Sequence, residues 1–119
     1  MVRLKHAYEP PERADGTRVL VERLWPRGLT KLKLKLDLWM KDVAPSAVLR
    51  TWYGHVPARW PEFQKRYRAE LAGKDALLKQ LRSMARGGTL TLVFAARDEV
   101  RNSAAVLRDV LAGRGDNCA

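Results

Sequence analysis

The stretch Thr89-Leu90-Thr91-Leu92-Val93-Phe94-Ala95-Ala96 decides the fold. Its second half is continuously apolar, and such a run is typical of a central strand covered on both faces by other parts of the chain. A Gly87-Gly88 pair precedes it and the charged pair Arg97-Asp98 follows it, so the strand is well bounded. We therefore expect 89–96 to lie in the middle of a sheet.

Three segments before it are predicted to be further strands: 2–8, 18–23 and 36–41. Breaker residues, Pro10-Pro11 and Asp15-Gly16, separate the first two, and eight or nine residues are short for a parallel crossover, so the place of 2–8 stays open. Leucines alternate with charged residues over 31–41, which is the period of a half-buried strand. A helical turn at 30–34 followed by a strand fits equally well, and we favour the strand for 36–41.

Helical spacing predicts helices at 46–53, 57–71 and 75–86, the first with Ser46 as its N-cap. A last helix follows over 100–111, with Asp98 as a candidate cap. This order indicates an α/β fold: a small, mostly parallel sheet of about four strands, with a mixed sheet as the alternative, covered by about four helices. We expect one domain over 1–112 and a flexible C-terminal tail at 113–119.

Charge and cysteine content limit the function classes. Of 119 residues, 23 are Lys or Arg and 13 are Asp or Glu, so the formal net charge is +10, which favours anionic partners. The lone Cys118 allows no intrachain disulfide, and two histidines without metal-ligand spacing predict no metal site. The charged N-terminal residues and the lack of a long apolar window predict a cytoplasmic protein without a membrane partner.

Known cofactor and nucleophile motifs are missing from the sequence. It has no Gly-x-Gly-x-x-Gly after a strand, no P-loop and no nucleophile elbow. We therefore expect no nucleotide cofactor, and we disfavour nucleotide-dependent dehydrogenases, P-loop NTPases and serine hydrolases.

Residues that suit anion binding gather where the predicted strands end. In open α/β sheets ligands tend to bind at the carboxyl ends of the strands. Charged, polar and aromatic residues at those ends are Arg23, Trp25, Arg27, Lys41, Asp42, Arg97, Asp98 and Asn102. Guanidinium groups suit bidentate contact with phosphate or carboxylate, and an indole offers a face for stacking. The sequence thus predicts an anion pocket with an aromatic wall.

Two residues are candidates for acid–base chemistry, and each has a structural alternative. His55 follows a glycine between two helices, and Asp98 follows the central strand. His55 is equally suited to being a structural hydrogen-bond donor, and Asp98 to capping a helix. Arg23 and Arg97 have such an alternative too, since ion pairs with Asp42 and Asp98 would hold the loops.

Several long motifs resemble those of the YeaO-like bacterial family, a domain of unknown function numbered 488. They are Val21-Glu22-Arg23-Leu24-Trp25-Pro26-Arg27-Gly28-Leu29, Trp39-Met40-Lys41-Asp42-Val43-Ala44-Pro45-Ser46, Leu49-Arg50-Thr51-Trp52-Tyr53-Gly54-His55 and Ala95-Ala96-Arg97-Asp98 with Asn102. The resemblance covers nearly the whole chain and implies a compact α/β domain, but no activity. The chain departs from the family pattern with Arg101 where relatives commonly have His, and with Glu22 in place of the more usual Asp.

Three hypotheses about function follow. The first is a pocket for a small anionic or phosphorylated ligand, with acid–base chemistry by His55 or Asp98 as an extension. The second is a nucleic-acid-binding module, with a regulatory role as one form of it, in which Trp25 or Trp52 stacks on bases and binding weakens steeply with salt. The third is an adaptor that docks a protein partner. The position of the charges on the folded surface discriminates the three.

Overall fold

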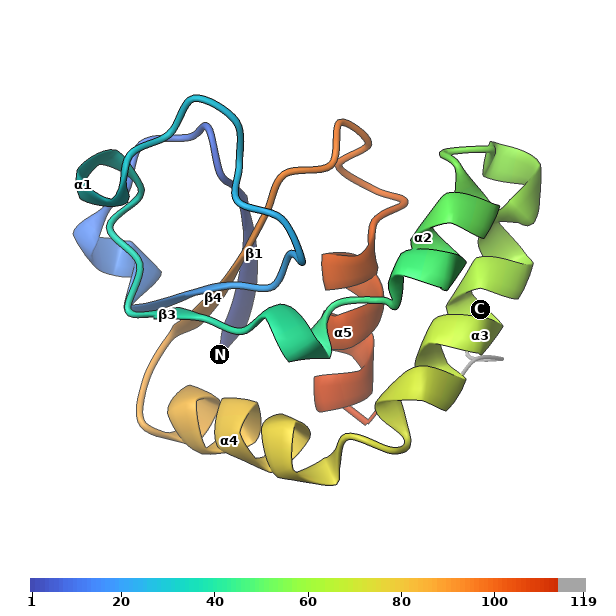
Figure 1. Ribbon diagram of the computed structural model, residues 1–119. Helices are drawn as coiled ribbons and strands as arrows, with labels where there is room; N and C mark the ends of the chain where they lie inside the picture. The colour runs from blue at the N-terminus through green and yellow to red at the C-terminus, as the bar shows by residue number, and fades with distance from the viewer. Residues whose placement is uncertain (114–119) are drawn as a thin grey trace.

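The computed structural model describes residues 1–113, in which four strands form one parallel sheet (Figure 1). The strands are β1 (Val2–His6), β2 (Thr17–Leu20), β3 (Leu38–Trp39) and β4 (Leu90–Phe94), and their spatial order is β1-β4-β2-β3. β4 is buried along its whole length and pairs with both β1 and β2. The predicted α/β class and the central place of this strand are confirmed, and every pairing is parallel.

The first strand pairs with a strand from near the other end of the sequence. β1 lies at the sheet edge and pairs with β4, with Val2 opposite Leu90 and His6 opposite Phe94. The connection from β1 to β2 therefore passes over β4, and a 3-10 helix at Arg13–Asp15 shortens its path. The short spacing left the place of this strand open because sequence does not reveal that another strand lies between the two.

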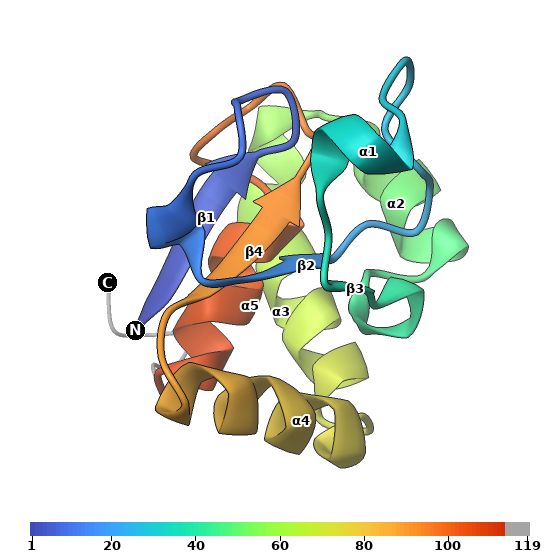
Figure 2. The same cartoon turned by 90° about the vertical axis from the view of Figure 1, so that its left-hand side faces the viewer.

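Helices cover the two faces unequally (Figure 2). The single turn α1 (Lys31–Leu34) lies on one face. The other face carries α2 (Ala47–Tyr53), α3 (Trp60–Leu71), α4 (Asp75–Arg86) and α5 (Ser103–Leu111). None of the helices within residues 1–113 is both long and apolar enough to cross a membrane.

Helix ends follow local hydrogen-bonding rules, with one correction. Ser46 caps α2 as its sequence predicts, accepting the N–H of Leu49, and Thr30 caps α1, accepting the N–H of Lys33. The predicted cap Asp98 does not cap α5; Asn102 does, and its Oδ1 accepts the Ala105 N–H at 2.9 Å. Asp98 instead accepts the N–H groups of Val100 and Arg101 and closes a turn before the helix. α5 therefore begins at Ser103, three residues later than predicted.

The two cores differ in character. The large core joins alternate β4 residues, Leu90, Leu92 and Phe94, to α2–α5. On the α1 face, Val93 packs with Leu20 and Leu34, and Trp25 and Trp39 pack against this smaller core.

Charged residues complete the α1 face. Asp15 is fully buried and binds Lys5 Nζ at 3.1 Å and Arg18 NH1 at 2.7 Å. Glu12 binds the same Lys5 ammonium at 2.7 Å. We call Lys5, Glu12, Asp15 and Arg18 the closed ion cluster.

The turn after this cluster requires glycine. Gly16 has φ +62°, and a Cβ there would lie 2.3 Å from the carbonyl oxygen of Thr89. The Asp15-Gly16 turn signal thus marks a close approach of two backbones. This approach lets Thr17 N–H donate to Thr89 O at the start of the β2–β4 pairing.

Candidate functional site

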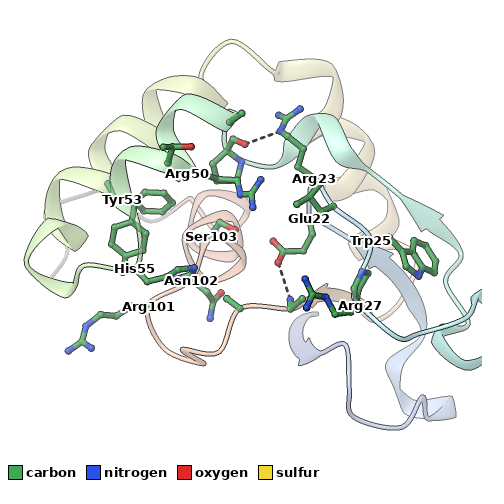
Figure 3. A pocket seen from close by; sticks show the side chains of 18 of the residues that line it. Glu22, Arg23, Trp25, Arg27, Arg50, Tyr53, His55, Arg101, Asn102 and Ser103 are labelled. Carbon is green, nitrogen blue, oxygen red and sulfur yellow. Dashed lines mark hydrogen bonds between the residues drawn. The ribbon is translucent and has the colours of Figure 1, made fainter.

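A pocket of about 470 Å³ opens at the carboxyl ends of β2 and β4 (Figure 3). Its walls come from the loop after β2, from α2 and the turn after it, and from the loop that leads into α5. Four arginines, one histidine and one carboxylate line it, together with polar and aromatic groups: Arg23, Arg27, Arg50, Arg101, His55, Glu22, Asn102, Ser103, Thr51, Tyr8, Trp25, Tyr53 and Phe63. We call it the strand-end pocket.

The four arginines are held in different ways. Arg23 donates to the carbonyls of Pro45 at 3.2 Å and Ala44 at 3.3 Å, so it braces the loop before α2. Arg101 pairs with Asp98 at 3.5 Å, and Figure 3 shows it directed away from the pocket centre. Within residues 1–113, the guanidinium groups of Arg27 and Arg50 have neither an ion pair nor a hydrogen bond. These two are the cations open to a ligand.

Arg50 is positioned by the way α2 is fixed at its start. The Ser46 hydroxyl donates to Glu70 of α3 at 2.6 Å, and the Ser46 N–H donates to the same carboxylate at 2.9 Å. Because Ser46 also caps α2, this contact sets where the helix begins, and Arg50 follows one turn later. Sequence reasoning assigned Arg50 no role, although it lies within one of the quoted motifs.

Glu22 is the other residue that sequence reasoning missed. Its Oε2 accepts the N–H of Ala95 at 3.1 Å, just beyond the end of β4. Burial raises the pKa of the Glu22 carboxyl, while the hydrogen bond from the Ala95 N–H and the positive charge of Arg50 act in the opposite direction. A half-buried carboxylate therefore lies in a pocket whose other charged groups are cationic.

The two histidines have different surroundings. His55 lines the strand-end pocket, is exposed and has a left-handed backbone with φ +58°. His6, which sequence analysis set aside, lies at the end of β1 with its Nε2 3.0 Å from Ala96 O and its Nδ1 3.3 Å from Tyr8 N. Both ring nitrogens of His6 are thus engaged, which leaves His55 as the histidine available to a ligand.

The structure brings half of the predicted site residues together. Arg23, Trp25, Arg27, His55 and Asn102 line the strand-end pocket. Among them, Trp25 is fixed by its indole N–H, which donates to Leu29 O at 2.6 Å. Asn102 is buried and donates to Asp98 O at 3.0 Å in addition to capping α5.

The other five lie outside the pocket lining: Lys41, Asp42, Trp52, Arg97 and Asp98. Lys41 belongs to a 3-10 helix after the edge strand β3, and its ammonium lies 4.5 Å from the Trp39 ring centre. Trp52 packs against two guanidinium groups, those of Arg59 and Arg66, at 5.6 and 4.2 Å. Asp98 is held by two backbone N–H groups, and these bonds hold its pKa below the usual value. Such a carboxylate is a weak general base.

The chain is similar to one protein family and to uncharacterized bacterial proteins. The DUF488-N3i family model, described as the inactive DUF488-N3 subclade, matches residues 1–118. The uncharacterized protein Rv3073c of Mycobacterium tuberculosis (strain H37Rv) is 45% identical over 113 residues, which is 95% of each chain. The uncharacterized protein YeaO of Escherichia coli (strain K12) is 40% identical over 110 residues, 92% of this chain and 96% of the relative. No solved structure matches the chain significantly.

Proposed function

The chain belongs to the DUF488-N3i family, and from this premise we propose that it binds a small anionic or phosphorylated ligand in the strand-end pocket. The observation that carries the proposal is the pair of arginines, Arg27 and Arg50, which line one pocket without any partner among residues 1–113. Guanidinium groups that stabilise a fold are paired, whereas a site that receives an anion needs cations with free donors.

The size of the pocket supports the same conclusion. A volume of about 470 Å³ suits a metabolite or a mononucleotide and lies in the range of known small-molecule sites. Tyr8, Tyr53 and Phe63 contribute aromatic lining. The Tyr8 hydroxyl donates to Arg27 O at 2.7 Å, which steadies the loop that carries Arg27. In this arrangement Arg27 and Arg50 contact the anion, and Arg23 positions the loop before α2.

Binding without turnover fits the description of the family as an inactive subclade. Of the two candidates for acid–base chemistry, we keep His55. Asp98 lies outside the pocket lining and is held by backbone N–H groups. The alternative function is salt-dependent nucleic-acid binding, and the net charge of +10 is the observation that favours it.

The test is a thermal-shift screen at low salt with inorganic phosphate, sulfate, mononucleotides, sugar phosphates and short DNA and RNA. We expect a rise in melting temperature with at least one small anion. Arg50→Gln and Arg27→Gln each remove one charge-assisted contact, so each should weaken that ligand by roughly tenfold to hundredfold.

Arg97→Gln is the matched control, because Arg97 follows the same central strand but does not line the pocket. It should bind the ligand as the wild type does. Equal weakening by all three variants would mean that only general charge matters and would contradict the pocket. A response to polynucleotides alone that disappears with added salt would replace the proposal with the nucleic-acid alternative.

A further inference from the structure

Glu22 gives the strand-end pocket a hydrogen-bond acceptor beside its cations. Of the two carboxylate oxygens, Oε2 is satisfied by the Ala95 N–H at 3.1 Å. Within residues 1–113, Oε1 has no hydrogen-bond partner, and Figure 3 shows the carboxylate directed into the same space as the guanidinium of Arg50. One oxygen is thus fixed to the scaffold and the other is presented to the cavity.

The backbone that carries Glu22 is held on both sides. Val21 N–H donates to Val93 O at 3.1 Å, which extends the β2–β4 pairing up to this position. The indole N–H of Trp39 donates to the main-chain carbonyl of Glu22 at 2.7 Å. With its own Oε2 bonded to Ala95, the side chain has little freedom to leave the pocket. A ligand that enters must therefore accommodate this carboxylate.

A purely anionic ligand accommodates it poorly. When a ligand displaces the water around Oε1, the oxygen loses its hydrogen bonds unless the ligand replaces them, and an unsatisfied buried acceptor is costly. A nearby phosphate would also repel the carboxylate, because like charges in a water-poor pocket are weakly screened. An N–H donor on the ligand restores the hydrogen bond to Oε1, and an ammonium group also offsets the repulsion between phosphate and carboxylate.

We propose that the ligand of the strand-end pocket carries an N–H donor in addition to its anionic group, and that Glu22 Oε1 accepts from this donor while Arg27 and Arg50 contact the anion. The ligand class is therefore an amine- or amide-bearing phosphate or carboxylate rather than a simple anion. This inference rests on the proposed function and specifies the ligand of the same site.

The experiment compares matched probes that differ in one terminal ammonium group, which is both the N–H donor and a positive charge. Isothermal titration of the full chain at neutral pH and low salt uses alkyl phosphates of two to four carbons and the corresponding ω-aminoalkyl phosphates. We expect the best aminoalkyl phosphate to bind roughly tenfold to hundredfold tighter than its alkyl counterpart, the effect of one charge-assisted hydrogen bond. Glu22→Gln keeps an oxygen for the Ala95 N–H but removes the acceptor charge, so it should abolish that preference.

The possible results separate the two proposals. If both probe series bind wild type equally, the anion site stands and the donor inference is overturned. If neither series binds and no anion of the thermal-shift screen does, the proposed function fails and the inference with it. If the preference survives in Glu22→Gln, the donor is recognised by another group and the role of Glu22 is wrong. Arg50→Gln should weaken the binding of both series, because it removes a contact to the phosphate that the two series share.

Discussion

The closed ion cluster and the strand-end pocket use charged side chains in opposite ways. In the cluster, the carboxylates of Asp15 and Glu12 pair with Lys5 and Arg18, and Arg3 lies 4.0 Å from Asp15; Asp15, Lys5 and Arg18 are at most 5% exposed. Four arginines and one carboxylate line the pocket, and two of these arginines, Arg27 and Arg50, are unpaired within residues 1–113. The difference teaches that charge serves the fold where it is internally balanced and is available for binding where the scaffold leaves it unbalanced.

The largest expected effect comes from breaking the balance in the cluster. Asp15→Asn keeps the shape of the side chain but leaves two buried cations short of one negative charge, which should lower the free energy of unfolding by about 3 kcal/mol. Urea unfolding followed by circular dichroism measures the change. Glu62→Gln, which breaks the exposed Arg66–Glu62 pair, is the control and should cost no more than about 0.5 kcal/mol. Equal costs for the two variants would contradict the special role of the cluster.

The next effect tests the turn that brings the cluster to β2. Gly16→Ala places a methyl group against Thr89 O in a backbone conformation that side chains rarely adopt, so it should destabilise the fold by about 2 kcal/mol or more. Gly87→Ala is the control, since Gly87 has an ordinary αR backbone and its added Cβ would meet only normal contacts. It should change stability by less than about 1 kcal/mol. A tolerated alanine at Gly16 would mean that the backbone approach can relax.

A smaller effect is expected at the floor of the pocket. Asn102→Ala removes the cap of α5 and the bond to Asp98 O, and should cost about 1 kcal/mol. Asn102→Asp retains the capping oxygen and should lose less. Thermal unfolding of both variants measures the difference, and an alanine variant as stable as the aspartate variant would show that the cap contributes little.

The smallest effect has the opposite sign. Since burial raises the pKa of Glu22 in the folded state, its ionised form disfavours folding, and Glu22→Gln should stabilise the protein by about 1 kcal/mol or less at neutral pH. The gain should vanish below pH 4.5, the ordinary pKa of the group, where glutamate is protonated in both the folded and the unfolded state. Melting temperatures of both proteins at pH 7 and pH 4 test this.

Through Asp15, lowering the pH should decrease the stability of the fold, which is opposite to its effect through Glu22. Burial alone would raise its pKa, but hydrogen bonds from the Glu12 N–H, Lys5 and Arg18 outweigh burial and hold it below the usual 3.8. The stability from this carboxylate is present above that value and is lost as pH falls through the folded-state pKa.

For Glu22, a Glu22→Gln variant that is less stable than the wild type at pH 7 would contradict the conclusion that the ionised carboxylate disfavours folding.

Prediction from sequence succeeded where a local pattern has one physical cause. The apolar run of β4, the Ser46 cap and the glycine turn all follow from short-range rules. The order of the strands depends on contacts between distant segments, and no local pattern reveals them. Both Arg27 and Lys41 were predicted to line the pocket. Arg27 does, because the loop after β2 lies there, whereas Lys41 does not, because β3 is an edge strand followed by a 3-10 helix.

Arg50 and Glu22, to which the sequence analysis assigned no role, show a second limit of prediction from sequence. Arg50 lies on a helix rather than at a strand end, and the rule about strand ends does not include it. Glu22 follows the end of β2 by two residues, but from the sequence it was noted only as a departure from the family pattern and was given no role. Only the hydrogen bond from Ala95 and the open Oε1 point to the acceptor role proposed for it. An acidic residue beside arginines in a strand-end motif is a signal that sequence analysis can use.

The pairing of β1 with β4 also sets the timing of folding during synthesis. Val2 is opposite Leu90, so the first strand leaves the ribosome long before its partner exists. At a translation rate of about 5 to 20 residues per second, the nascent N-terminal segment waits for roughly 5 to 20 seconds. During that interval it cannot join the sheet. Assembly of the sheet is therefore a late event, and a nascent chain that stops before β4 lacks the central strand of the sheet.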